Sequence, residues 1–325
     1  MHRLSVVIAN YNYARFLSAA IDSALAIDWP DVEVVVVDDG STDDSVEVIK
    51  GYGSTVTAIF TENGGQRAAC NHGFAASSGD VVVFLDADDV LPPAVARRVD
   101  AVMTPRTSKV QLQMQRITED GQPVGEPFPD FAPPPTPAQV RHWATTTTAY
   151  PTPPGSGNAY ARWFLERIFP VGPEVGAAAD SACLAAAPLL GDVVSLPGVL
   201  VGYRQHSAQD SSLLGDLSRF AREVGRARAR WRFALAASGA ALDDTPLFRS
   251  RELLQFRAAA SRVASAPSPL PGDGTSRRVL DAFRSPTWPG PEPVKVRLLI
   301  AGWTLAVLLA PSTAVPRLLR LRYSR

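Results

Sequence analysis

The stretch VVVFLDADDVLPP, residues 81–93, ends a run of apolar residues with three carboxylates, Asp86, Asp88 and Asp89. A short apolar run rich in valine is typical of a strand that is buried on both faces. Two like charges this close together repel by roughly 1 to 4 kcal/mol, depending on the effective dielectric constant. A helix cap would use one of these acids, but not three. The stretch therefore predicts a buried strand whose end binds a cation.

The first hundred residues repeat this strand pattern and alternate it with helix patterns. Apolar runs occur at residues 5–9, 32–37, 56–60 and 81–85. Residues 14–27 place apolar side chains at helical spacing, and residues 66–76 also read as a helix. Ser41 or Thr42 could cap a further helix that opens with Asp43 and Asp44. This alternation predicts an α/β fold with a mostly parallel sheet flanked by helices.

Polar residues follow each of the four predicted strands, at residues 10–13, 38–41, 62–67 and 86–89. In an open parallel sheet, ligands bind outside the carboxyl ends of the strands. Carboxylate oxygens suit Mg²⁺ or Mn²⁺, which take one or two protein carboxylates together with substrate phosphates. The chain has no GxxxxGK[ST] motif, and no GxGxxG motif follows the first strand. A kinase and a dinucleotide-dependent oxidoreductase are therefore disfavoured.

The composition narrows the class of protein further. The 325 residues include 32 basic and 32 acidic ones, so a nucleic-acid-binding surface over the whole protein is not expected. Cys70 and Cys183 stand in no metal-binding spacing, which suits a reducing compartment. The apolar run near the N-terminus is too short for a secretory signal. We therefore expect a cytoplasmic protein.

Seven stretches resemble glycosyltransferase family 2, which has the Rossmann-like GT-A fold. They cover about the first 210 residues in the family's order and spacing. They are SVVIANYN (5–12), VVVVDDGSTDDS (34–45), ENGGQRAACNHGFAASSGD (62–80), FLDADDVLPP (84–93), PPGSGNAYARWFLERIFPV (153–171), AADSACLAAAPLLGDVVSL (178–196) and GYRQHS (202–207). The resemblance implies inverting transfer of a sugar from a nucleotide-diphosphate sugar to an acceptor, with Mg²⁺ or Mn²⁺ as cofactor.

The resemblance also implies which residues bind the nucleotide of the donor. Ala9 and Tyr11 match positions beside the base, where the family stacks an aromatic side chain. Asp39 matches the acid that accepts a hydrogen bond from the base N–H, which favours uracil and therefore a UDP-sugar. Arg67, after the third strand, could reach the diphosphate.

A second group of residues matches the metal and diphosphate site. Asp86 and Asp88 match the family's DxD pair, in which Asp88 ligates the metal and Asp86 faces the ribose or shares the metal. Asp89 is expected to hold its neighbours in place. Arg204 and His206 fall where the family brings a late segment over the diphosphate, so either could offset phosphate charge or ligate the metal.

Asp180 matches the family's catalytic base. The acceptor hydroxyl must lose its proton as it attacks the anomeric carbon on the face opposite the leaving diphosphate. Members often carry Glu-Asp here, whereas this chain has Ala179 before the acid. A purely structural role for Asp180, as the cap of the helix that follows, stays open. Residues 156–158 match a loop near the acceptor.

The chain is expected to divide into three parts. Residues 1–104 form the nucleotide-sugar-binding half of the catalytic domain, residues 105–212 its acceptor-side half, and residues 213–325 a helical C-terminal extension. Residues 215–265 read as helix. The uncharged stretch LLIAGWTLAVLLA, residues 298–310, would span roughly 20 Å, which is short of a ~30 Å hydrocarbon core.

This uncharged stretch has two interpretations. It is either a helix that packs in a core or part of a segment, residues 295–325, that rests peripherally on the inner face of the cell membrane. Trp303 and the arginines after it would then be anchors at an anionic bilayer, which suits a glycan or lipid-linked acceptor.

Two alternative functions stay open. A nucleotidyltransferase also uses acids and a metal, but it usually carries a basic, glycine-rich signature near the N-terminus, and residues 5–16 have none. A nucleotide-sugar-binding module without catalysis is the other alternative, against which the set Asp39, Asp86, Asp88 and Asp180 argues.

Overall fold

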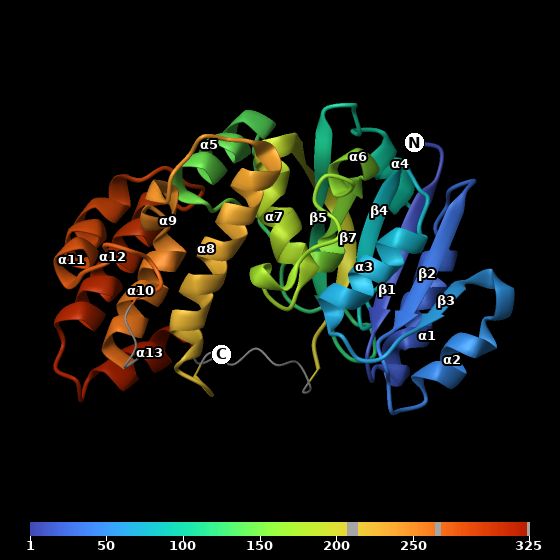
Figure 1. Cartoon of the computed structure of the whole chain (residues 1–325), viewed down its shortest axis with the longest axis horizontal. Helices are drawn as coiled ribbons and strands as arrows, with labels where there is room; N and C mark the ends of the chain where they lie inside the picture. The colour runs from blue at the N-terminus through green and yellow to red at the C-terminus, as the bar shows by residue number, and fades with distance from the viewer. Residues whose placement is uncertain (207–213, 264–267, 324–325) are drawn as a thin grey trace. The chain divides into compact units, whose positions relative to one another are not determined.

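The structure, a computed structural model, describes residues 1–206, 214–263 and 268–323. The chain divides into two compact units (Figure 1). Unit 1 consists of Met1–Arg141 and Pro151–Ser207, and unit 2 of His142–Tyr150 and Ala208–Arg325. The predicted boundary between residues 212 and 213 lies outside the described residues, as does Ser207 of the GYRQHS stretch.

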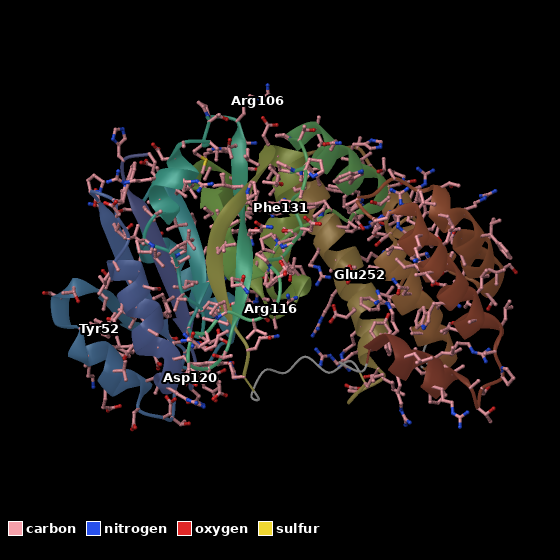
Figure 2. All side chains as sticks on the ribbon, turned by 180° about the vertical axis from the view of Figure 1, so that it is seen from behind. Tyr52, Arg106, Arg116, Asp120, Phe131 and Glu252 are labelled. Atoms are coloured by element: carbon pink, nitrogen blue, oxygen red, sulfur yellow. The ribbon has the colours of Figure 1, made fainter. Side chains whose placement is uncertain are left out.

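Unit 1 is built on a seven-stranded sheet with the strand order β3-β2-β1-β4-β6-β5-β7. Strand β6 pairs antiparallel with β4 and β5, and the other neighbours are parallel. Arg106 and Asp120, which are labelled in Figure 2, lie just outside the two ends of the long strand β5. The strands are β1 (Leu4–Asn10), β2 (Val32–Asp38), β3 (Thr57–Phe60), β4 (Val81–Asp86), β5 (Thr107–Ile117), β6 (Asn158–Ala161) and β7 (Asp192–Arg204). The predicted mostly parallel α/β fold and its first four strands are confirmed.

Helices flank this sheet, and those predicted at residues 14–27 and 66–76 lie close to their predicted positions. Helix α3 packs against β1 and β2, where a Cβ added at Gly73 would collide with Val7. Glycine at this position therefore allows the close contact. The helices and single turns of this part of the chain are α1 (Ala14–Leu25), α2 (Ser45–Gly51), η1 (Gly53–Thr55), α3 (Gln66–Ala76), α4 (Val95–Asp100), α5 (Pro137–Thr147, divided between the units), η2 (Gly155–Gly157), α6 (Arg162–Leu165), η3 (Pro173–Val175) and α7 (Ala179–Leu190).

The predicted cap of helix α2 is wrong. The helix begins at Ser45 with Asp44 at the N-cap position, which is later in the chain than either Ser41 or Thr42. The hydroxyl of Ser41 instead accepts hydrogen bonds from the Asn10 side chain and the Asn12 backbone amide. Ser41 therefore connects the ends of β1 and β2.

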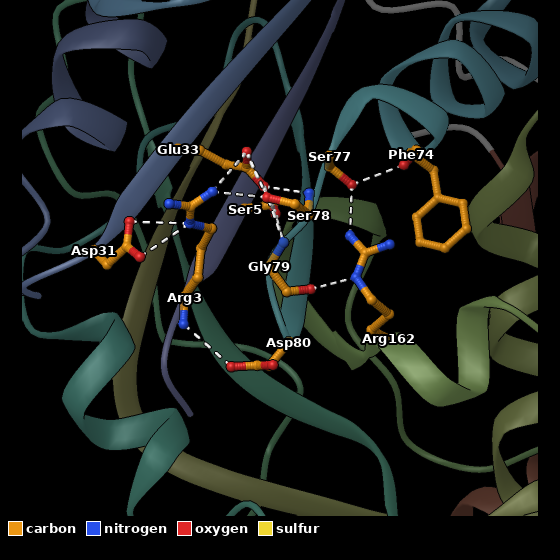
Figure 3. A network of polar contacts seen from close by, with 10 residues as sticks. All are labelled: Arg3, Ser5, Asp31, Glu33, Phe74, Ser77, Ser78, Gly79, Asp80 and Arg162. Carbon is orange, nitrogen blue, oxygen red and sulfur yellow. Dashed lines mark hydrogen bonds and ion pairs between the residues drawn. The ribbon is translucent and has the colours of Figure 1, made fainter.

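A polar network holds the amino ends of β1, β2 and β4 together (Figure 3). The Glu33 carboxylate accepts hydrogen bonds from the Ser5 hydroxyl at 2.5 Å and the Gly79 amide at 2.9 Å. Arg3 donates to Asp31, and the Asp80 carboxylate accepts from the Arg3 amide at 3.2 Å. This edge of the sheet is opposite to the edge where ligands are expected.

Unit 2 is helical around α10, which packs against α8, α11 and α12. Its elements are α8 (Arg219–Ser238), α9 (Thr245–Phe248), α10 (Arg251–Val263), α11 (Thr275–Arg284), η4 (Ser285–Thr287), α12 (Val294–Leu309) and α13 (Val315–Tyr323). The helix expected over residues 215–265 is broken at Gly239, which ends α8 with φ of 67° in the left-handed region.

A buried ion network lies in unit 2. The Arg257 guanidinium donates to Asp273 Oδ1 at 2.7 Å and to Asp281 Oδ2 at 2.7 Å, and Arg278 donates to Asp273 Oδ2 at 3.1 Å. The side chains of Arg257 and Asp273 are fully buried. The network joins α10 to α11 and to the loop before it.

The uncharged stretch 298–310 lies almost wholly in α12. Ala301, Thr304, Val307 and Leu308 are buried, whereas Leu298, Leu299 and Leu309 are exposed. One face of α12 therefore packs in unit 2 and another does not. Among the described residues, every helix is too short or too polar to cross a membrane.

Candidate functional site

The carboxyl ends of β1, β2 and β4 bring the predicted site residues to one edge of the sheet. Asn10 pairs in register with Asp38 of β2, and Ala9 pairs with Asp86 of β4. Tyr11, just past β1, is 45% exposed. Parallel pairing thus collects residues that are separated by up to about 75 positions in the sequence.

The two acids that end β2 have different partners. Asp38 accepts hydrogen bonds from the Asn10 side chain at 2.8 Å and the Ser41 amide at 2.9 Å, so it holds the turn together. Asp39 accepts from the amides of Gly64 and Gly65 at 2.9 and 2.7 Å. Each carboxylate oxygen has a second lone pair, so Asp39 keeps acceptor capacity for a base N–H.

Arg67 is held by the segment that precedes α7. Its guanidinium donates to the Val171 carbonyl at 3.0 Å, and its amide donates to the Ala177 carbonyl at 3.1 Å. These contacts fix the segment that precedes α7, and therefore the position of Asp180. The predicted approach of Arg67 to a diphosphate stays a prediction.

Three acids after β4 form the centre of the site. Asp86 accepts a hydrogen bond from the Gln66 side chain at 2.7 Å, and its amide donates to the Ser156 hydroxyl at 3.0 Å. Asp89 is buried and accepts from the Arg204 amide at 2.9 Å, so it connects the loop after β4 to β7.

The pKa values of Asp86 and Asp89 are raised, first by burial and then by the neighbouring carboxylates. Burial and the charges of Asp88 and Asp180 raise the pKa of Asp86 to about 7, against the hydrogen bonds from Gln66 and Ser156. Burial and the charges of Asp86 and Asp88 likewise raise the pKa of Asp89. An uncompensated cluster of carboxylates is the environment in which a bound cation is stabilised.

Strand β7 brings His206 and Arg204 to the acids. His206 Nε2 lies 3.0 Å from Asp88 Oδ2, and its ring packs against those of Tyr13 and Phe16. Arg204 instead donates to backbone carbonyls, including that of Asp88 at 2.8 Å. His206 therefore lies beside the side chain of the predicted metal ligand Asp88. Arg204 contacts the backbone of Asp88 and not its carboxylate.

Asp180 faces Asp86 across a glycine. A Cβ placed on Gly155 would lie 3.4 Å from Asp180 Oδ2 and 3.6 Å from Asp86 Oδ2, so the two carboxylates border the same small space. Helix α7 begins at Ala179 with Ala178 as its N-cap. Asp180 therefore lies within the first turn, where the helix dipole favours its charge, and is not the cap residue.

Sequence reasoning missed several residues of this site. Gln66 and Gly155 lie within the quoted stretches and Tyr13 directly follows the first of them, but their spacing to the acids exists only in the folded chain. Lys109, on β5, is buried and donates to the Thr152 hydroxyl at 2.8 Å. Burial lowers the pKa of Lys109, whereas the nearby Cys183 and Asp180 act to raise it.

The donor set fits a metal that also binds its substrate. Within the described residues, no group of three or more His, Cys, Asp or Glu side chains is spaced to hold a metal ion by itself. Asp86 and Asp88 supply two carboxylates, and His206 lies against one of them. Mg²⁺ and Mn²⁺ sites of this kind are completed by substrate phosphates and water.

Both the fold and the sequence are similar to those of known proteins. The fold is that of the GT-A class of α/β proteins, as the solved structures below show. Residues 5–161 match the model of glycosyl transferase family 2. Over 218 residues the chain is 40% identical to the glycosyltransferase alr2836 of Nostoc sp. (strain PCC 7120), covering 64% of this chain and 66% of that protein. Residues 5–161 therefore form a glycosyltransferase family 2 domain.

A second relative matches a shorter region. Over 97 residues the chain is 34% identical to the glycosyltransferase YibD of Escherichia coli K12, covering 29% of this chain and 28% of that protein. The chain thus matches less than two thirds of the length of either relative.

Two solved structures share the fold over nearly the whole chain. Residues 1–349 of TarS from S. aureus, in complex with UDP-GlcNAc, match with a TM-score of 0.58 at 16% identity, covering 99% of this chain and 92% of that one. The mannosyltransferase PcManGT from Pyrobaculum calidifontis, in complex with GDP-Man and Mn²⁺, matches with a TM-score of 0.50 at 21% identity, covering 97% and 84%. At these identities the likeness shows the fold alone.

Proposed function

We propose that the protein is a metal-dependent, inverting glycosyltransferase that moves a sugar from a UDP-sugar to a hydroxyl of a glycan or lipid-linked acceptor. The observation that carries this proposal is the approach of Asp86 and Asp180 to one space beside Gly155. A group that holds the donor and a group that takes the acceptor proton must border the same reaction centre, and the shared space between these two carboxylates supports this assignment.

The donor is bound by the edge of the sheet. Tyr11 stacks on the base beside Ala9, and Asp39 accepts from the base N–H. Asp86 and Asp88 hold the ion, assisted by His206. Mg²⁺ or Mn²⁺, when bound, neutralises charge that develops on the leaving diphosphate. Arg67 and Arg204 add positive charge around the diphosphate.

Asp180 acts as the general base. As the acceptor oxygen forms its bond to the anomeric carbon, the bond from that carbon to the diphosphate breaks, and the hydroxyl proton moves to a carboxylate oxygen of Asp180. Attack from the face opposite the diphosphate inverts the anomeric centre. The helix dipole of α7 favours the ionised form of Asp180 that this step requires.

The choice of UDP rests on Asp39 and on the fold likeness to TarS, which binds UDP-GlcNAc. PcManGT, with a similar fold, binds GDP-Man and Mn²⁺, so a guanine nucleotide is the natural competitor in any test. For location, we propose the cytoplasm, with residues 295–325 in peripheral contact with the inner face of the cell membrane.

Calorimetric titration of UDP, GDP and dTDP, with Mn²⁺ and then with EDTA, tests the donor site. We expect UDP to bind in a metal-dependent manner and more tightly than the other two nucleotides. Metal-independent binding would remove the metal from the proposal, and tighter binding of GDP would replace the UDP-sugar with a GDP-sugar. If no nucleotide binds, the acids after β4 serve another purpose.

A further inference from the structure

The exposed face of α12 is apolar along most of its length. At roughly 100° per residue, one stripe of this helix faces away from unit 2. It consists of Lys295, Leu298, Leu299, Gly302, Ala306 and Leu309. Leu298, Leu299 and Leu309 are 57, 63 and 69% exposed. The opposite face of α12 is buried in unit 2, so the helix is apolar on both faces. A helix with this pattern is normally covered on both faces.

A shallow groove of about 760 Å³ runs along this stripe. Lys295 is the charged residue among the eight that line it, and Leu318 of α13 forms its far wall. Trp303 fixes this wall, since its indole N–H donates to the Leu318 carbonyl at 3.0 Å. Contiguous apolar surface of this kind marks a contact with a protein or a membrane.

The segment that carries the groove has charges of one sign. Residues 293–325 contain six basic residues and no acidic residue. Lys295, Arg317, Arg320 and Arg322 are exposed on α12 and α13. A surface that combines exposed leucines with an excess of cations complements anionic lipid, whose head groups attract the cations while the acyl region accepts the leucines.

The length of α12 decides how it meets a bilayer. Its sixteen residues extend roughly 24 Å, which is less than a hydrocarbon core of ~30 Å. Its buried face is also committed to α10 and α11. The helix can therefore lie along a leaflet but cannot cross it while unit 2 stays folded.

We propose that the groove between α12 and α13 is a docking surface for an anionic lipid leaflet, with α12 parallel to the membrane plane. Leu298, Leu299 and Leu309 enter the head-group boundary, and Lys295 and Arg317 contact lipid phosphates. The lipid leaflet is then the partner in the peripheral contact proposed above. Only the purpose of docking, which is to reach a lipid-linked acceptor, rests on the proposed function.

Vesicle co-sedimentation of the full chain tests the proposal. We expect binding to vesicles that contain phosphatidylglycerol, and little binding to vesicles of phosphatidylcholine alone. Raising the salt from about 0.1 M to about 1 M shortens the screening length from ~10 Å to ~3 Å and should weaken binding. Leu298→Glu is expected to weaken binding by roughly tenfold or more, because an exposed leucine that would enter the leaflet is replaced by a charge that anionic lipid repels.

Leu242→Glu is the matched control, because Leu242 is 41% exposed in the same unit but outside the groove. Lys295→Glu removes one cation without touching an apolar contact and should weaken binding to anionic vesicles selectively. Calorimetric titration of UDP into each variant separates this proposal from the proposed function, since donor binding should be unchanged.

Three outcomes would overturn the docking surface. They are unchanged vesicle binding of Leu298→Glu, equal binding to both kinds of vesicle, and a dimer in sedimentation velocity that Leu298→Glu abolishes. The last result would assign the groove to a second copy of the chain. Thermal unfolding of each variant shows that loss of binding is not loss of folding.

Discussion

Asp88 and His206 meet at 3.0 Å, and this contact gives a prediction at the scale of single residues. We expect Asp88→Asn to abolish metal-dependent binding of UDP, because the change removes the charge that holds the ion. His206→Gln should weaken Mn²⁺ binding by about 10- to 100-fold, as expected for a residue that orients a ligand. Calorimetric titration of Mn²⁺ with UDP measures both effects. Asp216→Asn, an exposed acid of unit 2, is the control.

The contrary result is equally clear. If Asp88→Asn binds UDP with the same metal requirement as the unmodified chain, then Asp86 or another acid holds the ion. If His206→Gln leaves Mn²⁺ affinity unchanged, then the imidazole serves only to pack against Tyr13 and Phe16.

Asp180→Asn is predicted to separate binding from transfer. The amide keeps the size of the side chain but cannot take the acceptor proton, so transfer should fall by about 10²- to 10⁴-fold while UDP binding is retained. UDP release from the UDP-sugar in the presence of acceptor measures transfer. Ser181→Ala is the control, since its hydroxyl donates to Asp180 Oδ1 at a long 3.3 Å. Normal turnover of Asp180→Asn would mean that another group is the base.

The sequence could predict only those site residues that lie close together along the chain. Asp86 and Asp88 could be predicted because like charges this close repel, and Asp39 could be predicted because it follows a strand. The contact of His206 with Asp88 depends on the pairing of β5 with β7, which no local pattern reveals. The resemblance to a family, and not spacing, supplied His206 and Asp180.

At the scale of elements, the short turn η2 contains two glycines, of which one has space for a Cβ atom and the other does not. A Cβ at Gly155 would meet Asp180 and Asp86 at ordinary contact distances, whereas a Cβ at Gly157 would lie 2.6 Å from Pro153 Cβ. We therefore expect Gly155→Ala to change the free energy of unfolding by less than about 0.5 kcal/mol but to lower transfer by filling the space between the carboxylates. Gly157→Ala should cost about 1–3 kcal/mol through overpacking.

Urea unfolding and transfer assays on both variants check this contrast. Gly157→Ala serves as the matched control for a purely structural effect. Full transfer activity in Gly155→Ala would show that the space beside Gly155 is not the reaction centre.

The ion network between α10 and α11 predicts how the stability of unit 2 depends on pH. Burial acts to raise the pKa of Asp273, but the hydrogen bond and charge of Arg257, with Ser268 and Arg278, hold it below its usual 3.8. Because the folded-state pKa is depressed, the stabilisation is fully present above about pH 4 and is lost as the pH falls through the folded-state value. Asp273→Asn should cost about 3–5 kcal/mol at pH 7 by leaving Arg257 without its buried partner.

Urea titrations at pH 7 and near pH 3 measure this dependence. The unmodified chain should lose stability between the two, and Asp273→Asn should lose less over the same interval. Asp243→Asn, an exposed acid in the same unit, is the control. An equal acid sensitivity of Asp273→Asn would place the titrating group elsewhere.

Elements were predictable where one physical signal dominates. The first four strands are continuous apolar runs, and α1 and α3 have helical periodicity or a clear start, so their positions were correct. Strand β6 has only four residues, runs antiparallel and follows a proline-rich segment, so it carries no such signal. The start of α2 was misplaced because several residues before it can each accept hydrogen bonds, and Ser41 is used between strands instead.

At the scale of the whole molecule, the sequence predicts the class of fold but not the division of the chain. The α/β pattern and the helical C-terminal part are both visible in residue order. The assignment of His142–Tyr150 to unit 2, across a segment of unit 1, is a long-range property that composition does not show. The apolar stretch 298–310 could be read as core or as interface, and α12 has both a buried and an exposed face.

The network around Glu33 at the amino ends of the strands has a consequence for how this protein can evolve. This network joins the strands at one edge of the sheet, while the proposed ligand site lies at the other. Substitutions that alter donor or acceptor preference can therefore accumulate in the loops at the carboxyl edge without drawing on the contacts that align the strands. Directed evolution toward new sugars should begin with those loops and leave Ser5, Glu33 and Gly79 intact.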